Sequence, residues 1–147
     1  MALPLTRIQA IKENVAPDVP EQTQLRALVV SCELELRKGL VRTLESLKTD
    51  VVVCGRVVQA EEVLSGVPFD VVFCDEHLPD GSYADLIHAD RRQKVTPVIV
   101  TTTHGDWELY FSALSRGAFD VIRCPCRPTD VEMALIRVSR EGEATVE

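Results

Sequence analysis

The run that most constrains this 147-residue chain lies at residues 69–81 and reads FDVVFCDEHLPDG. Apart from Asp70, its first half is apolar at successive positions and rich in β-branched and aromatic residues, which favours a strand covered on both faces. Pro79 and Gly81 prevent the strand from continuing, so Asp75 lies at its carboxyl end. Ligands of parallel sheets bind beyond the carboxyl ends of the strands. Asp75 is therefore the first candidate for chemistry, with a plain turn or helix-capping acid as the alternative.

Strand-like and helix-like patterns alternate along the chain. Short apolar runs occur at residues 25–30, 50–54, 69–74, 97–101 and 119–123, and helical spacing of apolar residues follows each, at residues 36–47, 60–64, 82–87, 106–116 and 131–138. This alternation predicts a single parallel sheet with right-handed crossovers, which is a doubly wound α/β domain. The first strand is not followed by a glycine-rich turn, and the chain has no P-loop, so the phosphate cradle of a nucleotide site is missing.

Composition and charge exclude some classes of partner and some cellular locations. The formal net charge of -7 disfavours binding to the nucleic-acid backbone, so we expect no direct nucleic-acid partner. No run approaches the roughly twenty apolar residues of a membrane span, and the start does not resemble a signal peptide, so we expect a cytoplasmic protein without a membrane contact. We expect an N-terminal arm at residues 1–24, one domain at residues 25–140 and a C-terminal tail at residues 141–147.

Four segments at the predicted strand ends form a pattern: LVVSCEL at residues 28–34, DEHLP at 75–79, PVIVTTTHGD at 97–106 and GAFDVIRCP at 117–125. Together they resemble the receiver domain of two-component response regulators, as typified by the chemotaxis response regulator. The resemblance implies a flavodoxin-like sheet in strand order 2-1-3-4-5 with helices on both faces. It also implies a signalling module rather than an enzyme, with a histidine kinase or another signalling protein as partner. Asp75 would be the phosphoacceptor and Thr102 the switch hydroxyl.

The pocket departs from that family at three positions. Two acids hold magnesium in receivers, and Ser31 and Cys32 stand at their places; the phosphate-pairing lysine is replaced by Cys124. Glu33 follows at a position where many members also carry Glu. Magnesium prefers hard oxygen ligands, so the magnesium implied by the resemblance is predicted to bind weakly here. We identify the chain as similar to an atypical receiver, or pseudo-receiver.

Three functions stay open on the sequence. The leading interpretation is phosphorelay signalling with Asp75 as candidate phosphoacceptor, and the alternative is an interaction module that works without phosphorylation. A thiol-based sensor is the third, because Cys32 and Cys124 both lie near strand carboxyl ends, where His77 or His104 could complete a zinc site. Small buried side chains remain the favoured interpretation of the thiols, and the odd number of cysteines argues against a disulfide framework.

Aromatic residues mark a possible contact surface. Trp107, Tyr110 and Phe111 occupy one predicted helix and cannot all face inward, so at least one is expected on the surface. Receivers pair through this region, and we therefore predict a homodimer or partner contact within residues 106–138. Only residues 141–147 follow the predicted domain, which indicates either a single-domain regulator or a fragment of a longer one.

Overall fold

The structure is a computed structural model that describes residues 24–87 and 96–144. The predicted arm at residues 1–24 lies outside the described residues except for Gln24. The last helix continues through Ala144, so the predicted domain boundary at residue 140 falls inside a helix. Within the described ranges, no helix combines the length and the apolar character that crossing a membrane requires.

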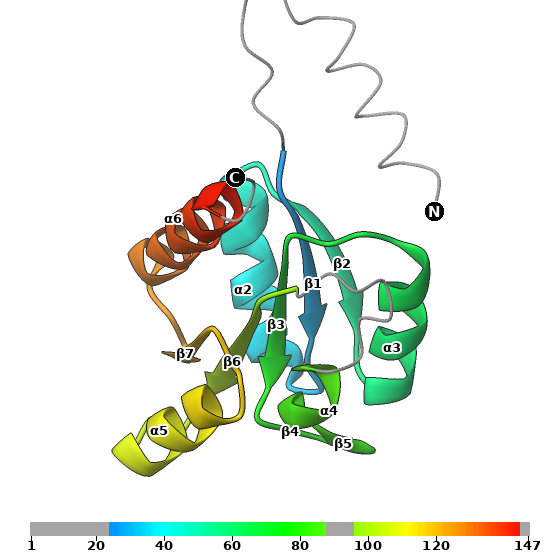
Figure 1. The fold of residues 1–147 in the computed structure, drawn as a ribbon, viewed down its shortest axis with the longest axis vertical. Helices are drawn as coiled ribbons and strands as arrows, with labels where there is room; N and C mark the ends of the chain where they lie inside the picture. The colour runs from blue at the N-terminus through cyan, green and yellow to red at the C-terminus, as the bar shows by residue number, and fades with distance from the viewer. Residues whose placement is uncertain (1–23, 88–95, 145–147) are drawn as a thin grey trace, which may run out of the picture.

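The core of the fold is a five-stranded parallel sheet (Figure 1). Its strands are β1 (Arg26–Val30), β2 (Asp50–Cys54), β3 (Val71–Asp75), β6 (Val98–Thr102) and β7 (Asp120–Arg123). They pair in the order β2-β1-β3-β6-β7. When only the strands of this sheet are numbered along the chain, β6 and β7 become the fourth and fifth, and the order is 2-1-3-4-5. This order confirms the predicted flavodoxin-like topology.

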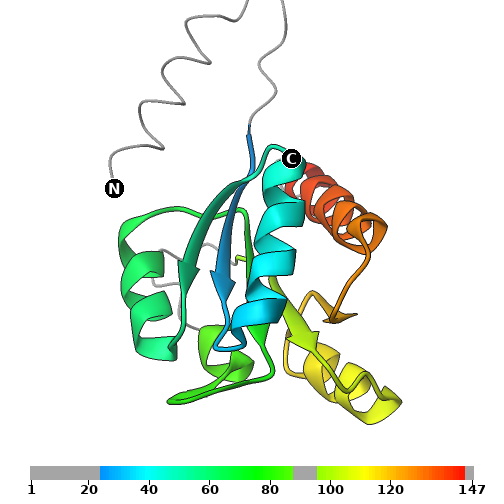
Figure 2. The ribbon, with the colours of Figure 1, turned by 180° about the vertical axis from the view of Figure 1, so that it is seen from behind.

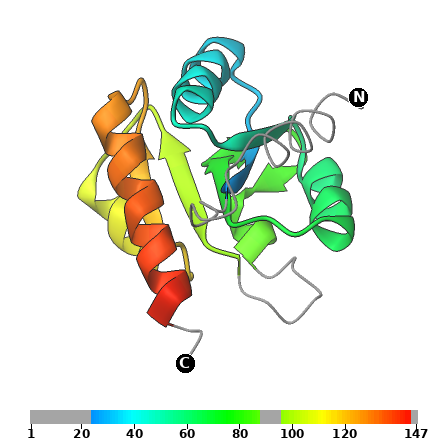
Figure 3. The same ribbon diagram turned by 90° about the horizontal axis from the view of Figure 1, so that it is seen from above.

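Helices cover both faces of the sheet, as Figure 3 shows from above. They are α2 (Leu34–Ser46), α3 (Val57–Gly66), α4 (Tyr83–Ile87), α5 (Trp107–Ser115) and α6 (Pro128–Ala144). Buried residues of α2 and α6 pack with Val29 and Phe73 on one face, and Figure 2 shows these two helices side by side. Buried residues of α3, α4 and α5 pack with Val30 and Val72 on the other. The alternation of side chains along each strand divides the core into these two layers.

Residues at the ends of α4 and α5 fix where these helices begin or end. Asp106 caps α5, with its Oδ1 accepting a hydrogen bond from the Leu109 N–H at 2.8 Å. The Ser82 hydroxyl accepts one from the Ala84 N–H at 3.3 Å at the start of α4. Gly117, with φ of +106°, follows the end of α5 in a conformation that side chains disfavour.

The sequence did not predict the short antiparallel pair β4 (His77–Leu78) and β5 (Gly81–Ser82). Asp80 lies at its turn and caps a helix from a distant part of the chain. Its two carboxylate oxygens accept hydrogen bonds from the N–H groups of Val57 at 2.8 Å and Val58 at 3.0 Å, the first two residues of α3. These backbone hydrogen bonds hold the pKa of Asp80 below its usual value.

We expect Asp80→Ala to lower the melting temperature at neutral pH, because α3 loses its N-terminal acceptor. A carboxylate whose pKa is lowered by folding stabilises the native state above its ordinary pKa of 3.8, and this contribution is lost as the pH falls through the lower folded value. The difference in melting temperature between wild type and variant should therefore shrink below pH 3.8. Thermal unfolding followed by circular dichroism measures both melting temperatures.

Glu62→Ala is the matched control, because it removes an exposed acid from α3 itself. It should leave the melting temperature nearly unchanged. If Asp80→Ala has no larger effect than Glu62→Ala at neutral pH, the capping role is wrong.

Candidate functional site

Asp75 ends β3 at the edge where the neighbouring parallel strands also end (Figure 1). Its Cα pairs with Thr101 of β6, and on the other side Ser31 directly follows the last residue of β1. Asp75 is half-buried, whereas Ser31 and Thr101 are buried. The strand register thus brings three residues from distant parts of the sequence to one point of the sheet edge.

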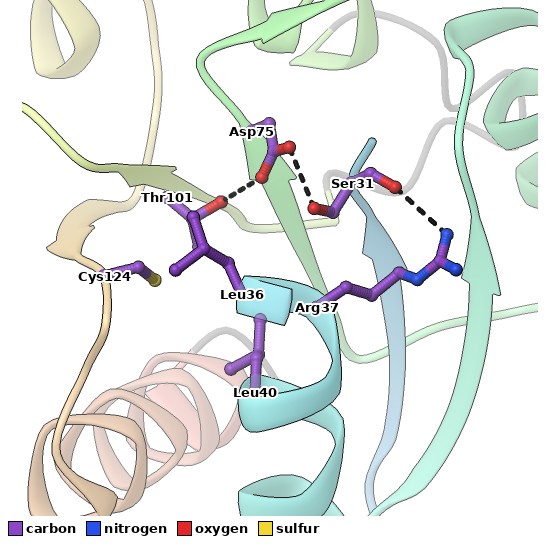
Figure 4. Close-up of a pocket in the computed structure, with 7 residues that line it drawn as sticks. All are labelled: Ser31, Leu36, Arg37, Leu40, Asp75, Thr101 and Cys124. Atoms are coloured by element: carbon purple, nitrogen blue, oxygen red, sulfur yellow. Dashed lines mark hydrogen bonds between the residues drawn. The ribbon is translucent and has the colours of Figure 1, made fainter. Parts of the chain in front are cut away.

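Neutral donors surround the Asp75 carboxylate, as the dashed lines of Figure 4 show for the two hydroxyls. Oδ2 accepts a hydrogen bond from the Ser31 hydroxyl at 2.8 Å and another from the Cys32 N–H at 3.1 Å. Oδ1 accepts one from the Thr101 hydroxyl at 2.9 Å. Both oxygens are therefore engaged, and none of these three donors carries a charge.

Thr102, the predicted switch residue, directs its hydroxyl elsewhere. It donates to Oε1 of Glu76 at 3.2 Å and accepts from the His104 N–H at 3.0 Å. Successive residues of a strand face opposite sides of the sheet, so Thr101 shares the face of Asp75 and Thr102 does not. Thr101 was not a predicted site residue, because the apolar residues before it do not show which of the two threonines faces Asp75. The switching role of Thr102 stays a prediction.

A small pocket of about 10 Å³ adjoins the carboxylate, with room for roughly one water molecule. Its lining comes from α2, β3, β6 and the loops after β1 and β7, and consists of Ser31, Leu36, Arg37, Leu40, Asp75, Thr101 and Cys124. Arg37 is the cation of this set, but Figure 4 shows its side chain extending to the Ser31 carbonyl, to which Nη1 donates at 3.3 Å. Asp75 therefore has no cationic hydrogen-bond partner among the residues lining the pocket.

The residues around Asp75 do not fit a magnesium ion. At the positions where acids are expected, Ser31 presents a neutral hydroxyl, and the Cys32 thiol lies 3.9 Å from Asp75 Oδ2. Magnesium takes oxygen ligands in a near-octahedral shell and binds thiols poorly. Within residues 24–87 and 96–144, no group of three or more His, Cys, Asp or Glu side chains is placed to hold one metal ion.

The predicted thiols near the strand ends have different surroundings. Cys74 is fully buried in the core, as expected of a small apolar side chain, and burial raises its pKa. Cys32 is exposed, and desolvation followed by the nearby Asp75 charge raises the pKa of its thiol. Cys124 is buried beside Thr101 and points into the pocket in Figure 4. The imidazole of His77 lies 3.4 Å from Glu76 and faces solvent.

Comparisons with known proteins agree with this architecture. The model of the response regulator receiver domain matches residues 27–136. The response regulator protein PilR of Pseudomonas aeruginosa is 38% identical over 101 residues, a match covering 68% of this chain and 23% of PilR. The chain spans 23% to 58% of the length of the curated relatives that it matches.

Solved receiver domains share the fold at low sequence identity. A signal receiver domain from Vibrio parahaemolyticus has a TM-score of 0.74 and 21% identity, covering 84% of this chain and 98% of that chain. The receiver domain of the sensor histidine kinase PA1611 from Pseudomonas aeruginosa has a TM-score of 0.69 and 19% identity, covering 78% and 97%. That second structure has a magnesium ion in its active-site cleft.

Proposed function

Because the chain belongs to the response regulator receiver domain family, we propose that it serves two-component signalling as a pseudo-receiver that binds its partner without phosphorylation of Asp75. The observation that carries this proposal is the neutral hydrogen-bond set around Asp75, with Ser31, Cys32 and Thr101 as donors. The partner is a histidine kinase or another signalling protein. We assign this role to residues 25–140 of a cytoplasmic protein that is not itself an enzyme.

The chemistry of phosphoryl transfer supports the proposal. Transfer to a carboxylate depends on positioning and on neutralising the charge of the phosphoryl oxygens, which metal ions and cationic side chains supply. Around Asp75, Ser31 and Cys32 stand where receivers have two acids, and Cys124 stands where they have a lysine. Hydroxyl groups that hold Asp75 through two different oxygens also oppose its approach to a phosphodonor. The site is thus arranged to keep one conformation.

We expect no gain of mass on Asp75 when the wild-type chain is incubated with acetyl phosphate and magnesium, because the charges that promote transfer are missing. Intact-mass spectrometry measures the adduct. Asp75→Ala is the matched control and sets the background of labelling at other sites. A gain of mass that requires both magnesium and Asp75 would contradict the pseudo-receiver proposal.

That contrary result would favour a second candidate function, phosphorelay signalling with Asp75 as a phosphoacceptor. The observation in its favour is the half-exposed position of Asp75 at the end of β3, where a donor can approach from solvent. In that case we propose that Thr102 exchanges its hydrogen bond to Glu76 for one to the phosphoryl group. Receivers transmit such a change to the surface of their last helices.

A surface for partners is proposed within residues 106–138. Trp107 and Phe111 on α5 are 74% and 61% exposed, which confirms that the aromatic residues of this helix do not all face inward. Their rings stack with centroids 5.8 Å apart, and Tyr110 meets Trp107 edge-on at 6.0 Å. Exposed aromatic groups of this kind are typical anchors of protein interfaces.

We expect Trp107→Ala to weaken homodimerisation, or binding to a partner, at least about 10-fold, since a central aromatic side chain is lost. Sedimentation equilibrium over a range of concentrations measures the self-association. Val58→Ala is the matched control, because Val58 is an exposed apolar residue as well, at 61%, but lies on α3. A wild-type chain that stays monomeric at high concentration, with partner binding untouched by Trp107→Ala, would refute this surface.

A further inference from the structure

Two neighbouring threonines at the end of β6 each donate a hydrogen bond to one of two neighbouring acids where β3 ends. The Thr101 hydroxyl donates to Asp75 at 2.9 Å, and the Thr102 hydroxyl donates to Glu76 Oε1 at 3.2 Å. Asp75 pairs with Thr101 in the strand register, and Glu76 and Thr102 are the next residues of the two segments. Because successive residues of a strand face opposite sides of a sheet, the second pair is separate from the hydrogen bonds that hold Asp75.

Backbone and side-chain contacts both fix Glu76. Its N–H donates to the Thr101 carbonyl at 3.0 Å, which continues the pairing of β3 and β6 past the last residue of β3. Its side chain is 28% exposed, so most of it is shielded from water. The second carboxylate oxygen, Oε2, lies 3.4 Å from Nε2 of the exposed His77. The two carboxylate oxygens therefore have different neighbours, and Oε1 serves Thr102.

Thr102 connects Glu76 with the loop that leads into α5. Its hydroxyl oxygen accepts a hydrogen bond from the His104 N–H at 3.0 Å, two residues before the capping residue Asp106. Thr102 is buried, and its carbonyl accepts another hydrogen bond from the Cys124 N–H at 2.7 Å. A hydroxyl has a single proton to donate, and Glu76 receives it here. The orientation of the Thr102 hydroxyl, and with it the acceptor offered to His104, therefore depends on Glu76.

We propose that Glu76 is a positioning residue, which gives Thr102 a permanent acceptor and so fixes the start of α5 without phosphorylation of Asp75. The Glu76 relay is the chain of hydrogen bonds from the His104 N–H through the Thr102 hydroxyl to the Glu76 carboxylate. A carboxylate suits this role because hydrogen bonds to charged acceptors are stronger than those to neutral ones. Glu76 thus takes the place that a phosphoryl oxygen would have as acceptor for the hydroxyl.

This role of Glu76 rests on the proposed function only in that α5 carries the surface for partners. Trp107, one of the exposed aromatic residues of that surface, is the first residue of α5. The relay reaches His104, and the cap of α5 at Asp106 comes two residues later. A fixed approach to the helix keeps the surface in one arrangement, which is what binding without phosphorylation requires.

Amide hydrogen exchange followed by NMR tests the relay on the full chain, with neither a phosphodonor nor a partner present. We expect Glu76→Ala to speed exchange at least about 10-fold at His104 and at Leu109. His104 loses its fixed acceptor, and the Leu109 N–H belongs to the cap that follows. Glu76→Gln keeps an oxygen acceptor and should restore both rates to within about 3-fold of the wild type. Each rate is divided by that of the Val57 N–H at the start of α3, which removes any change in overall stability.

His77→Ala is the matched control, because His77 lies beside Oε2 of the same carboxylate rather than Oε1. It should leave the rates at His104 and Leu109 unchanged. Thr102→Val removes the hydroxyl and should match Glu76→Ala, and the double variant should exchange no faster, since both residues belong to one relay. Equal exchange at His104 in the wild type and Glu76→Ala, or no rescue by Glu76→Gln, would overturn the role of Glu76. An unchanged rate at Leu109 would overturn the link to α5.

Failure of the proposed function would give a different result. Labelling of Asp75 by acetyl phosphate would refute the pseudo-receiver, and Trp107→Ala without effect on self-association or partner binding would refute the surface. Neither outcome alters the exchange rates expected for Glu76→Ala and Glu76→Gln, because those are measured without phosphodonor or partner.

Discussion

We expect the triple variant Ser31→Asp, Cys32→Asp, Cys124→Lys to be phosphorylated on Asp75 by acetyl phosphate and magnesium at least about 100-fold faster than the wild type. The Ser31 oxygen lies 2.8 Å and the Cys32 sulfur 3.9 Å from Asp75 Oδ2, so acids at both positions would group three carboxylates around one ion. Cys124 lines the same pocket, from which a lysine can pair with phosphoryl oxygens. Intact-mass spectrometry over time measures the rate.

The three changes are expected to act together. The effects of substituting ligands of one ion are not additive, so each single substitution should change the phosphorylation rate little. Without magnesium the new acids repel Asp75, and the triple variant should unfold at a lower temperature than the wild type. Added magnesium should raise that temperature in the triple variant and leave the wild type unchanged. A magnesium titration monitored by thermal unfolding therefore checks the metal site separately from the chemistry.

Adding Asp75→Ala to the triple variant is the control and should abolish the labelling. If a folded triple variant binds magnesium and is still phosphorylated no faster than the wild type, the missing charges are not what limits phosphorylation of Asp75. The hydrogen bond from Thr101 to Asp75 would then be the next feature to remove, by Thr101→Val.

Arg137→Ala should lower the free energy of unfolding by about 2 to 3 kcal/mol. Asp120 of β7 is buried, and its Oδ2 accepts a hydrogen bond from Nη2 of Arg137 on α6. Oδ1 accepts another from the Val121 N–H at 2.8 Å. Loss of the guanidinium leaves a buried carboxylate without its charge partner. The side chain of Arg137 is 50% exposed, so solvent screens the ion pair. We therefore expect a smaller loss of unfolding free energy than for a fully buried ion pair.

Urea unfolding measures this loss, with Arg140→Ala as the matched control because Arg140 is an exposed arginine of α6. The control should change stability by no more than about 0.5 kcal/mol. The double variant Asp120→Asn, Arg137→Met should recover part of the loss, because it removes both charges and keeps an acceptor for Val121. Equal stability of Arg137→Ala and Arg140→Ala would show that the ion pair contributes nothing.

The sequence by itself determined the architecture of this protein. Continuous apolar runs such as residues 71–74 indicated strands buried on both faces, and their alternation with helical spacing indicated a parallel sheet. Local signals also sufficed for the cap at Asp106, for the end of α5 at Gly117 and for Asp75 at the end of β3. These features depend on neighbouring residues, whose preferences act wherever the chain goes.

Only the tertiary structure decided which groups meet. Residues 98–100 are apolar on both faces of their strand, so the sequence does not reveal which face points toward Asp75. It therefore could not show that Thr101, rather than Thr102, contacts Asp75. A register shift of one residue would exchange the two, and pairing between distant strands sets that register. The cap of α3 by Asp80 likewise joins residues more than twenty positions apart. Such contacts exist only once the sheet has assembled, because the groups that make them belong to segments with no local relation.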